Sequence, residues 1–305
     1  MLYLALAIAC SLAIAAVFKM SERRGLDRMA LLAVNYAAGA LLAAGLTLQG
    51  SEVSTLGPGV VGLGVFTGAL FIGGFWIFAA AIRAAGIALA TAVMRLAVVV
   101  PVLASWAIWG ERPSALQLAG LAVAAVAIVL ITRPSRQHPV AANVDAALPA
   151  ASGEAEADGA GAGRTLALLL SLFVAAGMVD VSMKTFSEVY ARSVDEPVFL
   201  LFVFAVACVI GVVSVVRTGL AGKGWPKTEA YTWGVGLGVV NYGSAAFLLL
   251  AIERLSGPFV FPVNHISVVL GAALLGVVAW GERLSRANWA GLAVAGAALA
   301  LLWNG

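Results

Sequence analysis

Trp109-Gly110-Glu111-Arg112 recurs as Trp280-Gly281-Glu282-Arg283, 171 positions further along the chain. At the same offset, the stretch AGLAVA at 119–124 recurs at 290–295. Two gapless matches at one offset indicate that the second half of the chain arose by duplication of the first. Chance similarity between alanine-rich apolar helices is the alternative interpretation.

The composition indicates that both halves lie in lipid. Of the 305 residues, 62% are hydrophobic and only 11% are charged, and the mean hydropathy is +1.03. Soluble domains usually carry about 25% charged residues, so these charges are too few to cover a water-exposed surface. Glycine is abundant, at 34 residues. Small residues let membrane helices approach closely, and Gly64-x-x-x-Gly68 is one such pattern.

Ten apolar runs are long enough to cross a bilayer, whose hydrocarbon core of about 30 Å needs roughly 20 helical residues. We therefore predict an all-α membrane protein with ten transmembrane helices, five in each half. The predicted spans are 2–18, 29–48, 58–81, 87–109, 115–132, 165–186, 197–216, 231–251, 259–280 and 287–303.

The predicted domains follow from the repeat: residues 1–132 form one five-helix repeat and residues 165–305 the other. Residues 133–164 between them are rich in proline, acidic residues, alanine and glycine, a composition typical of a disordered linker. A regulatory segment is the alternative. Because five is an odd number, the second repeat must enter the membrane inverted. Inverted repeats are common in secondary transporters, although duplication can also simply build a larger bundle.

Lysine and arginine residues in the loops predict the orientation at the cell membrane. When the loops between the predicted spans are numbered from the N-terminus, the odd-numbered loops carry thirteen of these residues, whereas the even-numbered loops and the termini carry four. The odd loops, including 133–164, are therefore predicted to be cytoplasmic. Both termini are predicted to lie on the extracytoplasmic side.

Ionisable residues inside the spans are energetically costly and are candidates for function. By the rise per residue, Arg95 lies about 12 Å from the cytoplasmic boundary, and Asp180 and His265 lie roughly 8–9 Å below the opposite one. We predict that Arg95 holds an anionic substrate group and that Asp180 and His265 take part in proton coupling. A permanent Arg95–Asp180 ion pair and a structural, hydrogen-bonded His265 are the alternatives.

Further residues are predicted to bind substrate or contribute to coupling. Lys184 lies one turn beyond Asp180; it could instead snorkel to the headgroups or pair with Asp180. For Trp76 on the third span and for Asn241 and Tyr242 on the eighth, the alternative is helix packing in which the polar end of the side chain is hydrogen-bonded. The remaining candidates are Asn264, Asn241, Tyr242 and Trp76.

Three prolines, Pro101, Pro258 and Pro262, are predicted to interrupt the fourth and ninth spans, as hinges or as static kinks.

Several classes of protein are not expected. The sequence lacks a phosphate-binding loop of the type G-x-x-x-x-G-K-[ST], a zinc-protease H-E-x-x-H motif and a nucleophile elbow, so neither ATP-driven pumping nor an enzyme is predicted. Cys10 and Cys208 are too few for a disulfide framework or a thiolate metal site. The net charge of +3 forms no basic stripe with aromatic residues, so a nucleic-acid partner is not expected. No cofactor is predicted.

The repeated Trp-Gly-Glu-Arg turns, followed by Gly120 in one half and Gly291 in the other, resemble the EamA-type branch of the drug/metabolite transporter superfamily. The resemblance implies ten spans in two halves and a central cavity that spans four, six and nine help to line. Members of the superfamily export amino acids and other metabolites, or move sugars, nucleotide conjugates and drugs. The loop charges depart from the family, because many members have both termini in the cytoplasm.

The expected function is therefore secondary active transport, in particular export, of a small polar or charged metabolite such as an amino acid, by alternating access. The expected partners are this solute, membrane lipids and protons. Two alternatives remain: a flippase for lipid or lipid-linked headgroups on the same fold, and a membrane scaffold without transport. The sequence does not predict an oligomeric state.

Overall fold

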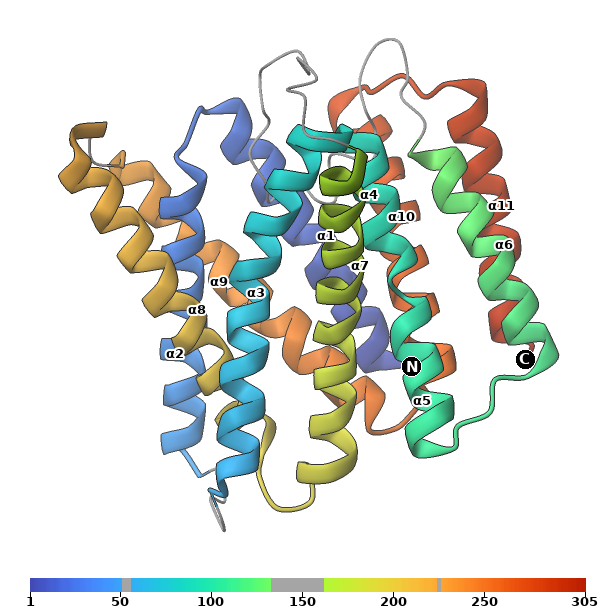
Figure 1. The fold of residues 1–305 in the computed structure, drawn as a ribbon, viewed down its shortest axis with the longest axis horizontal. Helices are drawn as coiled ribbons and strands as arrows, with labels where there is room; N and C mark the ends of the chain where they lie inside the picture. The colour runs from blue at the N-terminus through green and yellow to red at the C-terminus, as the bar shows by residue number, and fades with distance from the viewer. Residues whose placement is uncertain (51–55, 133–161, 224–225) are drawn as a thin grey trace. The chain divides into compact units, whose positions relative to one another are not determined.

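A computed structural model of the chain describes residues 1–50, 56–132, 162–223 and 226–305. Almost all of these residues are helical (Figure 1). The elements are α1 (Leu2–Arg23), α2 (Arg28–Leu48), α3 (Pro58–Ala85), α4 (Ile87–Leu96), α5 (Val99–Trp109), α6 (Ala115–Ile131), α7 (Ala162–Thr185), the π-helical turn η2 (Phe186–Tyr190), α8 (Glu196–Thr218), the π-helical turn η3 (Gly219–Lys223), α9 (Thr228–Ile252), α10 (Gly257–Trp280) and α11 (Arg286–Trp303).

The helices match the predicted spans. Within the described ranges, eight segments are long and apolar enough to cross a membrane, with α4 and α5 together forming the segment Ile87–Trp109. Helices α6, with 17 residues, and α11, with 18, occupy the places of the fifth and tenth predicted spans. The prediction of an all-α membrane protein is thus confirmed.

The boundary of the linker differs slightly from the prediction. Helix α7 begins at Ala162, inside the predicted linker 133–164. The rest of that segment, residues 133–161, lies outside the described residues, so its predicted disorder stays a prediction.

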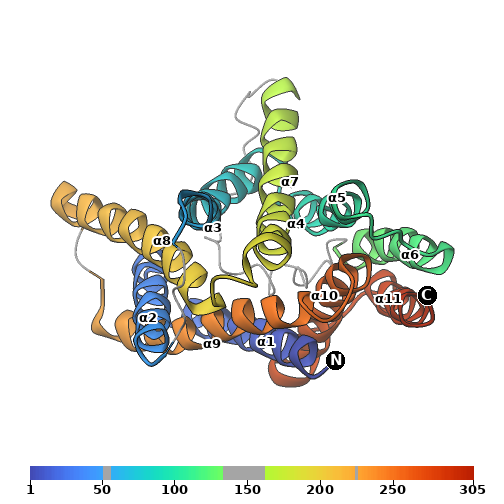
Figure 2. The same cartoon turned by 90° about the horizontal axis from the view of Figure 1, so that it is seen from below.

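The chain forms two compact units, and each takes helices from both sequence halves. Unit one comprises Met1–Gly73 and Ser182–Glu253, and unit two comprises Gly74–Val181 and Arg254–Gly305. In unit one, α2 packs on α8 and α9, and α1 packs on α9. In unit two, α6 and α11 lie side by side (Figure 2), and α10 packs on α5, α6 and α11. Spatial packing therefore does not follow the order of the two predicted repeats, whose boundaries remain a prediction.

Glycines let the helices of unit one approach backbone to backbone. A Cβ atom added at Gly234 of α9 would lie 2.6 Å from Cβ of Val34 on α2, and one added at Gly238 would lie 2.5 Å from the Asn35 carbonyl oxygen. At Gly68 of α3, an added Cβ would meet the backbone of α8. These close approaches are typical of helix interfaces in membranes, where small residues permit extensive dispersion contacts.

We expect Gly238→Val to destabilise unit one by about 1–3 kcal/mol, because the new side chain would press on the backbone of α2. Gly236→Val on the same helix is the matched control, since an added Cβ there meets nothing within 4 Å. The measurement is the melting temperature of each purified variant in detergent. Equal losses in the two variants would contradict the close packing of α9 on α2.

The duplicated stretch has the same local structure in both copies. Helices α5 and α10 are followed by Gly110 and Gly281, whose φ angles of 72° and 65° lie in the left-handed region that glycine adopts without strain. The next helices, α6 and α11, begin with capping boxes at Ser114 and Ser285. The similarity at an offset of 171 positions therefore extends from sequence to backbone conformation.

Candidate substrate and coupling site

Two of the predicted residues meet in unit two. Nε2 of His265, on α10, lies 2.9 Å from Oδ2 of Asp180, on α7. The side chains of His265 and Asp180 are only 16% and 10% exposed. Both residues belong to segments that are long and apolar enough to cross a membrane. A carboxylate and an imidazole at this distance can share or exchange a proton, and Coulomb attraction between their charged forms is stronger here than in water.

Two polar atoms, one in this pair and one in the neighbouring residue, are buried without a hydrogen-bond partner among the described residues. They are Oδ1 of Asn264 and Nδ1 of His265. Most buried polar atoms in folded proteins have at least one partner, and a water molecule, a ligand or an exchanging proton can supply one to these two atoms. An amide oxygen accepts hydrogen bonds, whereas Nδ1 of imidazole accepts or donates according to its protonation.

Arg95 lies in unit two, in the last turn of α4. Helix α4 ends at Leu96 and α5 begins at Val99, so Arg95 stands beside a break within one membrane segment. The break has a local cause: Pro101 has no N–H to donate to the Ala97 carbonyl, which instead accepts from the Val100 N–H at 2.9 Å. The helix dipole stabilises a cation at such a C-terminus.

The other two prolines differ from each other. Pro262 lies inside α10, as predicted, but Pro258 lies in the first turn of the helix. A first-turn proline needs no backbone partner and favours helix initiation. The expectation that Pro258 interrupts the ninth span is therefore wrong.

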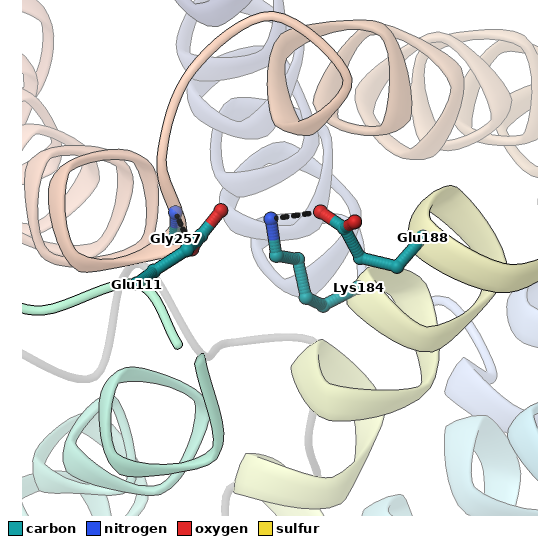
Figure 3. Close-up of polar contacts among 4 residues, drawn as sticks. All are labelled: Glu111, Lys184, Glu188 and Gly257. Atoms are coloured by element: carbon teal, nitrogen blue, oxygen red, sulfur yellow. Dashed lines mark hydrogen bonds and ion pairs between the residues drawn. The ribbon is translucent and has the colours of Figure 1, made fainter. Parts of the chain in front are cut away.

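Lys184 and its ion-pair partner lie in unit one. The Lys184 side chain is 1% exposed, and its Nζ lies 2.6 Å from Oε1 of Glu188 (Figure 3). The Lys184 ammonium group is buried in protein and paired with Glu188, which argues against the snorkelling alternative. Glu188 belongs to the π-helical turn η2, beyond the predicted end of the sixth span at residue 186. Sequence reasoning missed it, although the i, i+4 spacing of a lysine and a glutamate was a usable signal.

Glu111, for which the sequence suggested no partner, caps a helix in unit two. Oε2 of Glu111 accepts a hydrogen bond from the Gly257 N–H at 2.7 Å (Figure 3). Gly257 is the first residue of α10, so the carboxylate satisfies one of the backbone donors that a helix start leaves unpaired. No local pattern in the sequence marks this contact, because the two residues are 146 positions apart.

The remaining candidates have less distinctive surroundings. In unit one, Nδ2 of Asn241 donates to Oδ1 of Asn35 at 3.1 Å, and the ring of Tyr242 lies 5.9 Å from that of Phe204. These contacts join α9 to α2 and α8 and are typical of helix packing. Trp76, in unit two, is 46% exposed.

The predicted site is thus distributed over both compact units. Unit two contains the Asp180–His265 contact together with Arg95, Asn264 and Trp76, and unit one contains Lys184, Asn241 and Tyr242.

Comparison with known proteins supports the resemblance seen in the sequence. Residues 1–133 match the EamA-like transporter family. An uncharacterized protein of Haemophilus influenzae (strain ATCC 51907 / DSM 11121 / KW20 / Rd) is 24% identical over 298 residues, which cover 94% of this chain and 92% of that protein. A solved crystal structure of a protein has a TM-score of 0.74 at 18% identity, covering 98% of this chain and 94% of that chain. The likeness to the crystal structure shows the fold.

Proposed function

We propose that the chain, whose residues 1–133 match the EamA-like transporter family, is a multi-pass membrane protein that works as a secondary active transporter. Its substrate is a small polar or charged metabolite, such as an amino acid. The proposed direction is export, by alternating access between the two sides of the membrane. The internal repeat supports this proposal. The ionisable residues inside membrane segments support it too, because a membrane scaffold does not require them.

One observation carries the coupling proposal: the Asp180–His265 contact with the unpartnered Nδ1 of His265. In neutral His265 with its proton on Nε2, this nitrogen donates to Asp180 and Nδ1 is an acceptor. When a second proton binds at Nδ1, the imidazolium is stabilised by the carboxylate and Nδ1 becomes a donor. Protonation therefore reverses the hydrogen bond that Nδ1 offers to a substrate, which links proton binding to substrate binding.

We assign the anionic group of the substrate to Arg95. Its guanidinium presents a planar fork of N–H groups that grips a carboxylate through two parallel hydrogen bonds. The location in the last turn of α4, beside the break before Val99, supports this role. Unwound backbone within a membrane segment is tolerated where it lines protein or a water-filled cavity, and transporters place binding sites at such breaks.

The test of the function begins with purified protein and a thermal-shift screen of amino acids, sugars, nucleotides and polyamines, because a ligand of the folded state raises the melting temperature. The hit is then followed in proteoliposomes under an imposed pH gradient. We expect accumulation against the solute gradient, abolished by a protonophore. Movement of a labelled lipid headgroup without movement of solute would instead assign a flippase.

We further propose that both termini are extracytoplasmic. The physical basis is the excess of lysine and arginine in the odd-numbered loops. A reporter that is active only in the cytoplasm is expected to be silent when fused after Gly305 and active when inserted in residues 133–164. The reverse pattern of activity would invert the topology.

A further inference from the structure

We propose that Glu111 and Glu282 are alternating helix caps. Glu111 holds the start of α10 in the state seen here, and Glu282 holds the start of α4 in the opposite state of the transport cycle. This inference rests on the proposed function, in which the protein alternates between two states.

The sequence repeat pairs both partners of the contact. The offset of 171 positions that relates Glu111 to Glu282 also relates Gly86 to Gly257. Gly86 is the N-cap of α4 and Gly257 is the first residue of α10. Each repeat therefore contains a glutamate just after a left-handed glycine turn and a glycine at the start of the membrane segment that ends at this turn.

The contact made by Glu111 is close and directional. Its Oε2 accepts the Gly257 N–H at 2.7 Å, and a Cβ atom added at Gly257 would lie 3.1 Å from the same oxygen. That Cβ would also meet the hydroxyl of Ser105 on α5. Only glycine lets the end of α5 and the start of α10 approach this closely. The negative charge of Glu111 is further stabilised by the positive end of the α10 dipole.

The equivalent position in the other repeat is arranged differently. The Gly86 N–H donates to the Ile82 carbonyl of α3 at 2.8 Å, so the start of α4 is bonded to the helix before it. By contrast, α9 ends at Ile252, and the start of α10 is bonded to Glu111 across unit two. Two related segments thus occupy two distinct conformations.

Inverted repeats offer a direct route from one state to the other, because exchanging the conformations of the two repeats yields the opposite-facing protein. Applied to this contact, the exchange releases Gly257 from Glu111. It transfers the Gly86 N–H from the Ile82 carbonyl to the carboxylate of Glu282.

The test uses distances between spin labels at the two ends of the α4–α5 segment and α10, in the full-length protein. All four label positions are exposed and lie in unit two. The first pair reports on the end held by Glu111, and the second on the end near Glu282. The label pairs are Arg112→Cys with Ser256→Cys, and Arg83→Cys with Arg283→Cys. The background removes the native thiols through Cys10→Ser and Cys208→Ser.

Glu111→Ala should lengthen the first distance and shorten the second, by about a fivefold shift in the ratio of the two populations, as expected for the loss of one helix cap. Glu282→Ala should shift both distances in the opposite directions by a similar factor. The variants Glu111→Gln and Glu282→Gln retain a hydrogen-bond acceptor without the charge. Each should shift the distances in the same direction as the alanine variant at its own position, but by less.

Shifts of the same sign in the two alanine variants, or no shift in either, would overturn the proposal. If Glu111→Ala does not fold, Glu111→Gln and Glu282→Ala decide by the same sign rule. Solute transport by the wild-type protein is measured separately in proteoliposomes. Opposite shifts without transport would leave the caps in place and refute the proposed function, whereas transport with unresponsive distances would refute the caps alone.

Discussion

Asp180→Asn is expected to abolish proton-driven transport while leaving the protein folded. The amide has the size of the carboxylate and can still form a hydrogen bond to Nε2 of His265, but it carries no charge to stabilise the imidazolium. We expect pH-driven transport of the solute to fall by on the order of 100-fold, comparable with the loss of a positioned proton-transfer group. Exchange of labelled for unlabelled solute, which needs no net proton movement, should persist.

The measurements are pH-driven accumulation and solute exchange in the same proteoliposomes. His265→Gln should reproduce the phenotype of Asp180→Asn, since either change removes one member of the Asp180–His265 pair. The matched control is Glu229→Gln, which changes a carboxylate outside the pair, in the first turn of α9. Intact pH-driven transport in Asp180→Asn would make the His265 contact a structural hydrogen bond.

Arg95→Ala is expected to abolish transport with little change in melting temperature. The substrate would lose the two parallel hydrogen bonds of the guanidinium, and lysine should restore only part of the activity because it lacks the planar fork. Arg83→Ala is the matched control: Arg83 is an exposed cation in the last turn of α3, so its removal should leave transport intact.

Stability distinguishes this role from a permanent ion pair between Arg95 and Asp180. In a buried pair, removing one partner destabilises the protein by roughly 3–5 kcal/mol, because it leaves an uncompensated charge. The double variant Arg95→Ala with Asp180→Ala would then recover its stability. Loss of melting temperature in each single variant, recovered in the double variant with transport intact, would refute substrate binding by Arg95.

The ten spans could be predicted because each depends on local physics. Lipid selects apolar runs of a minimum length, and local signals set several ends. Asp27 caps α2 by accepting the Ala30 N–H at 2.7 Å, which places the start of the helix at Arg28, one residue before the predicted start. The largest difference is α1, which continues to Arg23 instead of ending at Phe18. Hydropathy ends a span at its first charges, whereas the backbone can stay helical beyond them.

The candidate site could be predicted only in part. Depth follows from the rise per residue, so assigning Asp180 and His265 to one level needed no knowledge of packing. The rotation of each helix about its axis was not predictable, because a helix that is apolar on every side has no polar stripe to show which face meets protein. The partner of Glu111 depends on that rotation and on a contact across 146 positions.

The pairing of α6 with α11 has a consequence for biosynthesis. Asn288, at the start of α11, donates to the Leu130 and Ile131 carbonyls at the end of α6, at 3.3 and 2.8 Å. The Ile131 contact joins residues 157 positions apart, so at about 5–20 residues per second the ribosome needs roughly 8–30 s to supply the partner. Throughout that interval, the last carbonyls of α6 must be satisfied by water or headgroups. A nascent chain halted before α11 would therefore present an incomplete first half to the quality-control machinery of the membrane.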